Sequence, residues 1–184
     1  MVERIVAAGR SVLVDDGYDA FSTNRVAAEA GISPGSLYQY FPDKAAILDV
    51  VVDRYWERVA DGVAASLSDR ITGIGPTLVR DVADALLTAL ESDRALMRVV
   101  AEELPLGRNR ERLSDLERRV RDLSTAYLAA RPATSRRPDP AAAAWMIVLA
   151  IENLAVRWVL DRPAITRDEF LDEIVALVGG YLLS

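Results

Sequence analysis

A run of small and polar residues between Ser22 and Lys44 has the side chains best suited to hydrogen bonding with another molecule. Gln39 carries an amide that can form two hydrogen bonds with the edge of an adenine base. Ahead of it stand four residues that are too small to hold a neighbouring surface away, namely Ser33, Pro34, Gly35 and Ser36. A helix that begins with such residues can press its first turn into the major groove of DNA. The chemistry expected here is readout of base edges.

The same segment has the signals of two short helices joined by a turn. Ser22 or Thr23 can cap the first helix, because a hydroxyl there accepts from a backbone N–H that has no partner within the helix. Gly31 supplies the turn, and Ser33 caps the second helix. The pattern predicts a helix-turn-helix, whose first helix would bring Thr23 and Arg25 to the opposite wall of the groove.

The segment from Phe21 to Lys44 resembles the DNA-binding signature of the tetracycline-repressor (TetR) family. It shares the family's hydroxyl pair before the second helix, its Ala-Gly-hydrophobic-Ser turn and its Leu-Tyr-x-Tyr-Phe-x-x-Lys run. The resemblance implies phosphate contacts for Tyr38, Tyr40 and Lys44, with base contact as an alternative for Tyr38. It also implies a helical regulatory region that forms a dimer and encloses a ligand pocket.

Two of these assignments have a plain structural alternative. Either tyrosine could instead pack against the first helix as part of the core, as we expect of Leu37 and Phe41. Lys44 is the single lysine among 22 basic residues, and it could be an ordinary solvated charge. Its compact ammonium would, however, suit a DNA phosphate that a wider guanidinium fits less well.

The charge of the chain constrains any contact with DNA. The formal net charge is −6, so binding must come from a small local patch. Residues 1–56 contain five basic and eight acidic side chains, a balance of −3, so the expected reading segment is not basic. TetR-family proteins usually carry a basic extension ahead of the first helix. Either the affinity for DNA is modest, or the natural protein begins upstream of Met1.

The chain contains no cysteine and no histidine. The chain therefore lacks the side chains that form the usual zinc and transition-metal sites. It also lacks the histidine that a Ser-His-Asp triad requires and that is the commonest general base. An enzyme of this composition would depend on carboxylates, with Glu102, Glu103 or Glu152 as acid or base. We expect no metal, no cofactor and no enzymatic activity.

Apolar residues recur at helical spacing along the whole chain, which predicts an all-α protein of about nine helices. Residues 1–46 should form the helix-turn-helix DNA-binding domain, and residues 47–184 a ligand-binding and dimerisation domain. The expected helices span about 3–15, 22–30, 33–42, 43–67, 76–90, 93–104, 110–130, 140–160 and 167–183.

The helices around 141–160 and 167–183 are the most apolar. Two such helices from each of two subunits can form a four-helix bundle, which predicts a homodimer that reads a palindromic operator in double-stranded DNA. The longest unbroken apolar run, 141–151, is shorter than the roughly 20 residues of a membrane span. With no secretion signal at the N-terminus, we expect a cytoplasmic protein without a membrane segment.

A small, largely apolar effector of unspecified identity should bind among the helices between about 76 and 160. The expected lining residues are Met97, Val100, Leu123, Tyr127, Trp145 and Leu149, although each could be plain core. Glu152 and Asn153 either anchor the ligand or fix the register of the dimer. The predicted function is a ligand-responsive transcriptional regulator, usually a repressor, that the effector releases from DNA. The alternative is a helical protein-interaction adaptor with weak or lost DNA binding.

Overall fold

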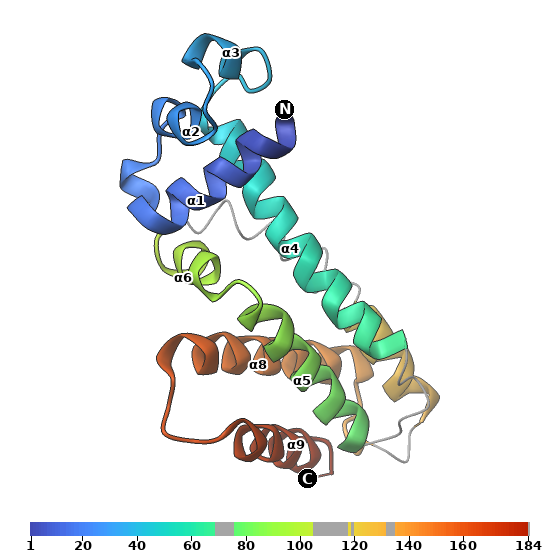
Figure 1. Ribbon diagram of the computed structural model, residues 1–184. Helices are drawn as coiled ribbons and strands as arrows, with labels where there is room; N and C mark the ends of the chain where they lie inside the picture. Colours follow the sequence, from blue (N-terminus) through green and yellow to red (C-terminus); the bar gives the residue numbers. More distant parts are fainter. Residues whose placement is uncertain (69–75, 105–117, 119, 132–134, 184) are drawn as a thin grey trace. The chain divides into compact units, whose positions relative to one another are not determined.

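The computed structural model of the chain describes residues 1–68, 76–104, 118, 120–131 and 135–183. All regular structure in these ranges is helical (Figure 1), which confirms the predicted all-α class. Residues 120–130 are helical, while most of 110–119 in the predicted helix 110–130 lies outside the described part of the chain.

Contacts between residues divide the chain into two compact units. Unit 1 comprises Met1–Arg58 and Asp93–Arg112, and unit 2 comprises Val59–Ser92 and Leu113–Ser184. These units do not follow the predicted boundary at 46/47, because a segment from the middle of the chain packs with the N-terminal residues. The functional division at that boundary stays a prediction.

Unit 1 is built around the helix-turn-helix. Its helices are α1 (Val2–Ala20), α2 (Thr23–Glu29), α3 (Pro34–Tyr38), α6 (Arg94–Glu102) and the beginning of α4 (Lys44–Ser68). In Figure 1, α2 lies above α1 and next to the start of α4, and α3 lies above α2. The side chains that hold these helices together are almost fully buried: Ile5, Leu13, Phe21, Val26, Leu37 and Ile47.

The helix caps in unit 1 are those that the sequence predicts. The Ser22 hydroxyl accepts from the Arg25 amide at 3.4 Å and begins α2. The Ser33 hydroxyl accepts from the Ser36 amide at 3.1 Å and begins α3. Gly31, between the two helices, has a φ of +63°, a left-handed conformation that glycine adopts without steric cost. The turn chemistry therefore sets the angle between α2 and α3.

Helix α6 is docked on α1 by an ion-pair cluster at its first turn. Asp93 caps α6 through the Leu96 amide and accepts from Arg10 Nε at 2.6 Å and Nη2 at 2.7 Å. Arg58 Nη2 lies 3.6 Å from the same carboxylate. Burial alone would raise the pKa of the Asp93 carboxyl, but the hydrogen bonds from Arg10 and Leu96 and the two positive charges hold that pKa below its usual range. The cluster joins α1, α4 and α6 in unit 1.

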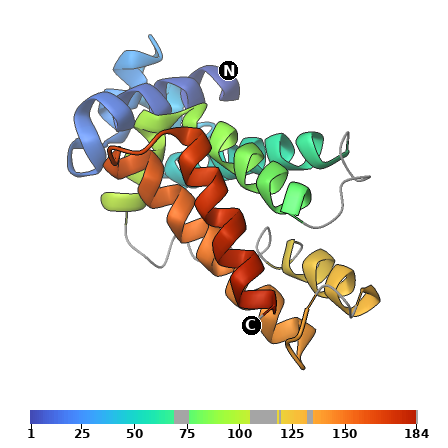
Figure 2. The ribbon, with the colours of Figure 1, turned by 90° about the horizontal axis from the view of Figure 1, so that it is seen from below.

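Unit 2 contains α5 (Pro76–Glu91), α8 (Pro140–Asp161), α9 (Arg167–Leu183) and the helical residues 120–130. Helix α5 contacts both α8 and α9. Helices α8 and α9 run side by side (Figure 2). A small core joins the helix at 120–130 to α8 and α9 through Leu128, Ala143 and Ala144, against which Tyr127, Tyr181 and Leu182 pack.

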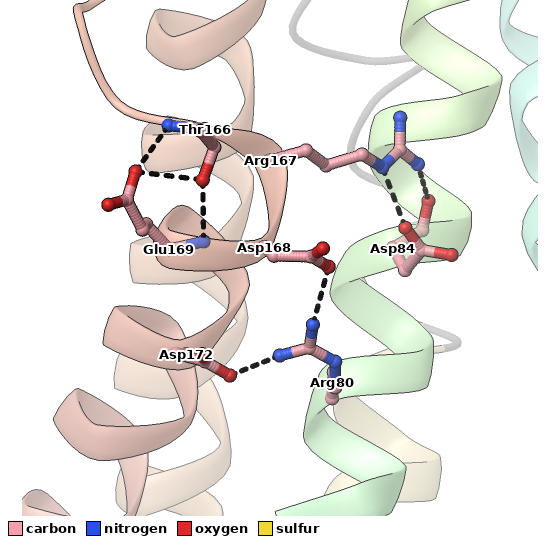
Figure 3. A network of polar contacts seen from close by, with 7 residues as sticks. All are labelled: Arg80, Asp84, Thr166, Arg167, Asp168, Glu169 and Asp172. Atoms are coloured by element: carbon pink, nitrogen blue, oxygen red, sulfur yellow. Dashed lines mark hydrogen bonds and ion pairs between the residues drawn. The ribbon is translucent and has the colours of Figure 1, made fainter.

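A predicted capping box begins α9. The Glu169 carboxylate accepts from the Thr166 amide at 2.7 Å, and the Glu169 amide donates to the Thr166 hydroxyl at 3.2 Å (Figure 3). This reciprocal pair satisfies two backbone donors at the helix start. It also lowers the pKa of the Glu169 carboxyl through the hydrogen bonds from Thr166.

Two arginines on opposite helices then fasten α9 to α5 (Figure 3). Arg80 of α5 reaches Asp168 at 2.8 Å and also pairs with Asp172. Arg167 of α9 donates in the other direction, to the Asp84 carboxylate and backbone carbonyl, each at 2.8 Å. The same guanidinium also bonds the carboxylate of Glu91. We call these contacts the α5–α9 network.

Helix α8 is only partly covered by its neighbours in the single chain. In the single chain one side is exposed, at Trp145, Met146, Leu149 and Leu154. By length and composition alone α8 could cross a membrane. The length of the apolar run 141–151 predicts that it does not. Of the most apolar 18 residues of α8, 33% are buried. Core helices of other proteins pass the same test. These four large apolar side chains are therefore open to solvent in the single chain.

Candidate nucleic-acid interface

Helix α3 and the two residues after it expose the predicted DNA-reading side chains. Pro34, Gly35 and Gln39 are all exposed, and Tyr38 and Tyr40 are 53% and 46% exposed. Leu37 and Phe41 point inward, with exposures of 0% and 6%, as predicted. Both tyrosines are therefore surface side chains, and the alternative in which they form core is wrong for this structure. We call these five exposed residues, from Pro34 to Tyr40, the reading surface.

An open depression with a volume of about 430 Å³ lies beside the reading surface. It is lined by Asp19, Ala20, Phe21, Ser22, Thr23, Tyr38, Pro42, Asp43 and Lys44. Tyr38 and Thr23 share a hydrogen bond between their hydroxyls at 3.1 Å across it. The structure thus brings two predicted DNA-contacting hydroxyls and the single lysine together, from three different helices.

Lys44 is held at the edge of this depression. Its Nζ donates to the Phe21 carbonyl at 3.3 Å and lies 5.7 Å from the centre of the Tyr18 ring. An ammonium near an aromatic ring gains about 0.5–1 kcal/mol at an exposed site. These two contacts orient the ammonium and leave it with donor capacity for an anion, since one ammonium has three N–H bonds.

Three further predicted DNA-contacting residues also form contacts within the chain, in addition to Thr23, Tyr38 and Lys44. The Ser33 and Ser36 hydroxyls form a hydrogen bond with each other at 2.9 Å, and the Ser33 hydroxyl also caps α3. This cap is the other role that the sequence predicts for Ser33. Arg25 forms an ion pair with Asp16 at 2.5 Å, with both side chains exposed. Asp16 therefore balances the charge of the cation on α2 that is predicted to meet DNA.

Sequence reasoning did not single out Asp16, and its local context gives little signal. It lies in α1, separated from Arg25 by the kink at Gly17, where φ is +79°. The pairing depends on how the chain turns after Gly17, and spacing along one helix cannot reveal it. The acidic balance of residues 1–56 was the only indication that a carboxylate would face a reading residue.

The predicted effector-binding residues fall in both units. Met97 and Val100 are buried in unit 1, with exposures of 1% and 2%. The other six lie in unit 2, so neither unit contains the set. Of these, Tyr127 and Glu152 are half-buried, whereas Leu123, Trp145, Leu149 and Asn153 are exposed. Asn153 donates to the Leu149 carbonyl of its own helix at 2.8 Å.

The three carboxylates considered for catalysis do not converge within a unit. Glu102 and Glu103 are exposed and belong to unit 1, while Glu152 is half-buried in unit 2. The described residues contain no group of three acidic side chains that could hold a metal ion.

Comparison with known proteins connects this arrangement to a family. Residues 5–51 match the family model described as bacterial regulatory proteins, tetR family. Residues 76–182 match the model described as tetracyclin repressor-like, C-terminal domain. The transcriptional activator FasR of Mycolicibacterium smegmatis is 29% identical over 99 residues, which are 54% of this chain and 44% of FasR. The chain therefore spans less than half of that relative.

Solved structures share the fold at lower identity. The fatty acid degradation regulator FadR from Bacillus halodurans has a TM-score of 0.73 and 17% identity, covering 97% of this chain and 94% of its own. FadR from Bacillus subtilis, in complex with stearoyl-CoA, has a TM-score of 0.70 and 18% identity, with 97% of both chains covered. Since the second family model alone covers more than half of the residues, the chain belongs to the tetR family of bacterial regulatory proteins.

Proposed function

We propose that the chain is a ligand-responsive transcriptional repressor that binds a palindromic operator as a homodimer. The observation that supports DNA binding is the juxtaposition of the reading surface with the depression that holds Lys44. Gln39 lies exposed at the end of α3, where an amide can read a base edge. Lys44, Thr23 and Tyr38 supply donors for the phosphate backbone.

The electrostatics shape this proposal. Arg25 is paired with Asp16, and the chain carries a net charge of −6, so little long-range attraction draws DNA in. Affinity should then depend on close fit at small residues such as Gly35 and on the two-fold spacing of the reading surfaces. A protein of this kind acts in the cytoplasm, where its DNA target lies.

A mobility-shift assay with DNA flanking the chain's own gene tests DNA binding. We expect a retarded complex, and the change Gln39→Ala should lower affinity for the operator by about 5- to 150-fold for each bound subunit, as loss of one bidentate base contact does. Affinity for unrelated DNA should stay the same, because Gln39 carries no charge. No specific complex with any fragment, together with a stable dimer, would favour the adaptor alternative.

The exposed apolar sides of α8 and α9 support a homodimer. In the part of α9 that follows Glu173, the exposed residues are Ala176, Leu177, Gly180 and Leu183, and none of them is charged. A Cβ added at Gly180 would meet nothing within 4 Å, so the backbone there is open to a close neighbour. A glycine inside a helix costs about 1 kcal/mol relative to alanine, and close approach by a second helix would offset that cost.

Light scattering on a sizing column tests the dimer. The wild-type chain should elute at twice its mass of 20.1 kDa. Leu177→Glu should give monomers, because a charge would enter an apolar bundle. Leu123→Glu is the matched control, since Leu123 is 68% exposed but lies on neither helix. A dimeric Leu177→Glu protein, or a monomeric control, would contradict the assignment.

For the effector we propose a fatty acyl-CoA. The solved FadR structure from Bacillus subtilis holds stearoyl-CoA, and the present chain has the same fold over almost its whole length. Such a ligand regulates DNA binding only if it prefers a conformer that is unfit for the operator.

Stearoyl-CoA and free CoA are the probes for this assignment. We expect stearoyl-CoA at about 100 times its Kd to stabilise the folded chain by about 2.7 kcal/mol and to release the operator, whereas CoA alone should do neither. If stearoyl-CoA leaves both the melting temperature and the operator complex unchanged, the acyl-CoA assignment fails while the DNA-binding proposal stands.

A further inference from the structure

The last turn of α1 has a backbone donor that its own helix cannot satisfy. Gly17 has φ +79° and ψ 173°, which breaks the regular helix. One further turn follows, closed by the Phe21 amide donating to the Tyr18 carbonyl at 3.2 Å. Because the chain changes direction at Gly17, the Tyr18 N–H lies at the beginning of that turn and needs an acceptor outside α1.

Glu103 supplies this acceptor from the C-terminal end of α6. Its Oε2 accepts from the Tyr18 N–H at 2.9 Å. A Cβ at Gly17 would lie only 3.1 Å from the same oxygen, so the glycine both turns the chain and leaves room for the carboxylate. The neighbouring Leu104 is buried, and α6 contacts α1. A carboxylate that accepts from a backbone N–H forms one of the stronger classes of hydrogen bond.

The turn that Glu103 holds leads directly to the predicted phosphate contact. The Tyr18 ring lies 5.7 Å from Lys44 Nζ, and the Phe21 carbonyl accepts from the same ammonium at 3.3 Å. Both contacts of Lys44 thus come from the two ends of one turn. The residues from Asp19 to Thr23 form one wall of the Lys44 depression.

We infer that Glu103 is a positioning residue for DNA binding, whose carboxylate fixes the turn Tyr18–Phe21 and through it the ammonium of Lys44. The inference rests on the proposed function for its consequence, but the bond itself is independent of DNA. The hydrogen bond from Tyr18 to Glu103 also connects α6 to the reading surface without passing through α4. A shift of α6 would withdraw the carboxylate from Tyr18. All the residues involved lie in unit 1.

Three variants of the full chain separate positioning from a general effect on stability. Glu103→Ala removes the acceptor, while Glu103→Gln keeps a side-chain oxygen that can accept from Tyr18. Glu102→Ala is the matched control, because Glu102 is the adjacent exposed carboxylate of the same helix and its loss changes the charge equally. Urea unfolding of each variant shows whether global stability changes.

Nuclear magnetic resonance reads the positions of Tyr18 and Lys44 directly. Since Lys44 is the single lysine, ¹³C-lysine labelling gives one set of signals, and its ε-methylene should show the ring-current shift of Tyr18. We expect Glu103→Ala to remove much of this shift and to speed amide exchange at Tyr18 by about tenfold, as loss of one charge-assisted hydrogen bond should. Glu103→Gln and Glu102→Ala should resemble the wild type.

The same variants are then compared for binding to a DNA fragment that the wild-type chain retards. Glu103→Ala should lower affinity by about three- to tenfold, with Glu103→Gln largely restoring it. Three results for Glu103→Ala would overturn the inference. They are an unchanged rate of amide exchange at Tyr18, a faster exchange at Tyr18 with the Lys44 signal still at its wild-type position, and a wild-type affinity for DNA. If the wild type binds no DNA, the proposed function fails, and the Lys44 signal still decides whether Glu103 positions that ammonium.

Discussion

Asp93→Asn tests how firmly α6 is attached to the DNA-reading unit. Asparagine caps a helix about as well as aspartate, so the bond to the Leu96 amide can persist. The change removes the negative charge that accepts two hydrogen bonds from Arg10, at 2.6 and 2.7 Å. It therefore isolates the ion pair from the cap.

The magnitude follows from the exposure of the two partners. The Asp93 side chain is 9% exposed, whereas that of Arg10 is 42% exposed. Hydrogen bonds to charged groups contribute about 1.5–3 kcal/mol, and water can rehydrate Arg10 and screen its charge. We therefore expect a loss of about 2 kcal/mol in the free energy of unfolding, or about 4–8 °C in melting temperature for a chain of this length.

The loss should depend on pH with a definite sign. The pKa of the Asp93 carboxyl is lower in the folded state than in the unfolded chain. A carboxyl of this kind stabilises the fold above its unfolded pKa of about 3.9, and the stabilisation disappears as pH falls through the lower folded value. The difference between wild type and Asp93→Asn should be full at pH 7 and shrink below about pH 4.

Urea unfolding followed by circular dichroism measures this difference, with a double-mutant cycle between Asp93→Asn and Arg10→Gln. Asp61→Asn is the control for charge, because Asp61 is an exposed residue of α4. We expect a coupling energy of about 1–2 kcal/mol for the pair. A loss below about 0.5 kcal/mol, or one that is equally large at pH 7 and pH 3.5, would refute the reasoning from burial and geometry.

Three further changes test other contacts. Arg167→Met removes the bonds from α9 to α5 and should lower the free energy of unfolding by about 1–2 kcal/mol in urea; an unchanged midpoint would contradict a stabilising network. Asp16→Asn frees Arg25 from its ion pair and should raise affinity for unrelated DNA about two- to fivefold at low salt, measured by mobility shift; weaker binding would show that Asp16 holds Arg25 in its productive position. Tyr38→Phe removes an exposed hydroxyl bonded to Thr23, so stability should change by less than about 0.5 kcal/mol while operator affinity falls about threefold or more; equal affinity would remove Tyr38 from the contact set.

The parts of the structure that the sequence predicts well depend on residues close together in the chain. The cap at Ser33 needs a hydroxyl and an amide three residues apart. The same holds for the box formed by Thr166 and Glu169. The burial of Leu37 and exposure of Gln39 follow from helical periodicity over one turn.

The contacts that sequence reasoning did not find join distant residues. Arg10 and Asp93 are 83 positions apart, and Tyr18 and Glu103 are 85 apart. Nothing in local composition distinguishes these carboxylates from the other acidic residues. Glu103 illustrates this point, because the sequence indicated a possible acid or base, whereas the structure gives it a backbone donor.

Helix α8 shows a different limit. Its apolar residues cover nearly every side, and the sequence pattern is the same whether a neighbour in the chain or a second copy covers them. Trp145 and Leu149 were predicted to line an effector pocket, yet both are exposed in the single chain, on the helix predicted to form the dimer. Only their environment in the assembled protein can assign them to a ligand or to a partner subunit.

The salt dependence of operator binding tests the central claim most directly. Lys44 is proposed to meet a DNA phosphate, so Lys44→Ala should lower affinity for all DNA sequences alike. The slope of log affinity against log salt concentration should become shallower by about one unit for each bound subunit. An unchanged slope, or a loss of affinity confined to the operator, would contradict the assignment of the Lys44 depression as the phosphate-contacting part of the interface.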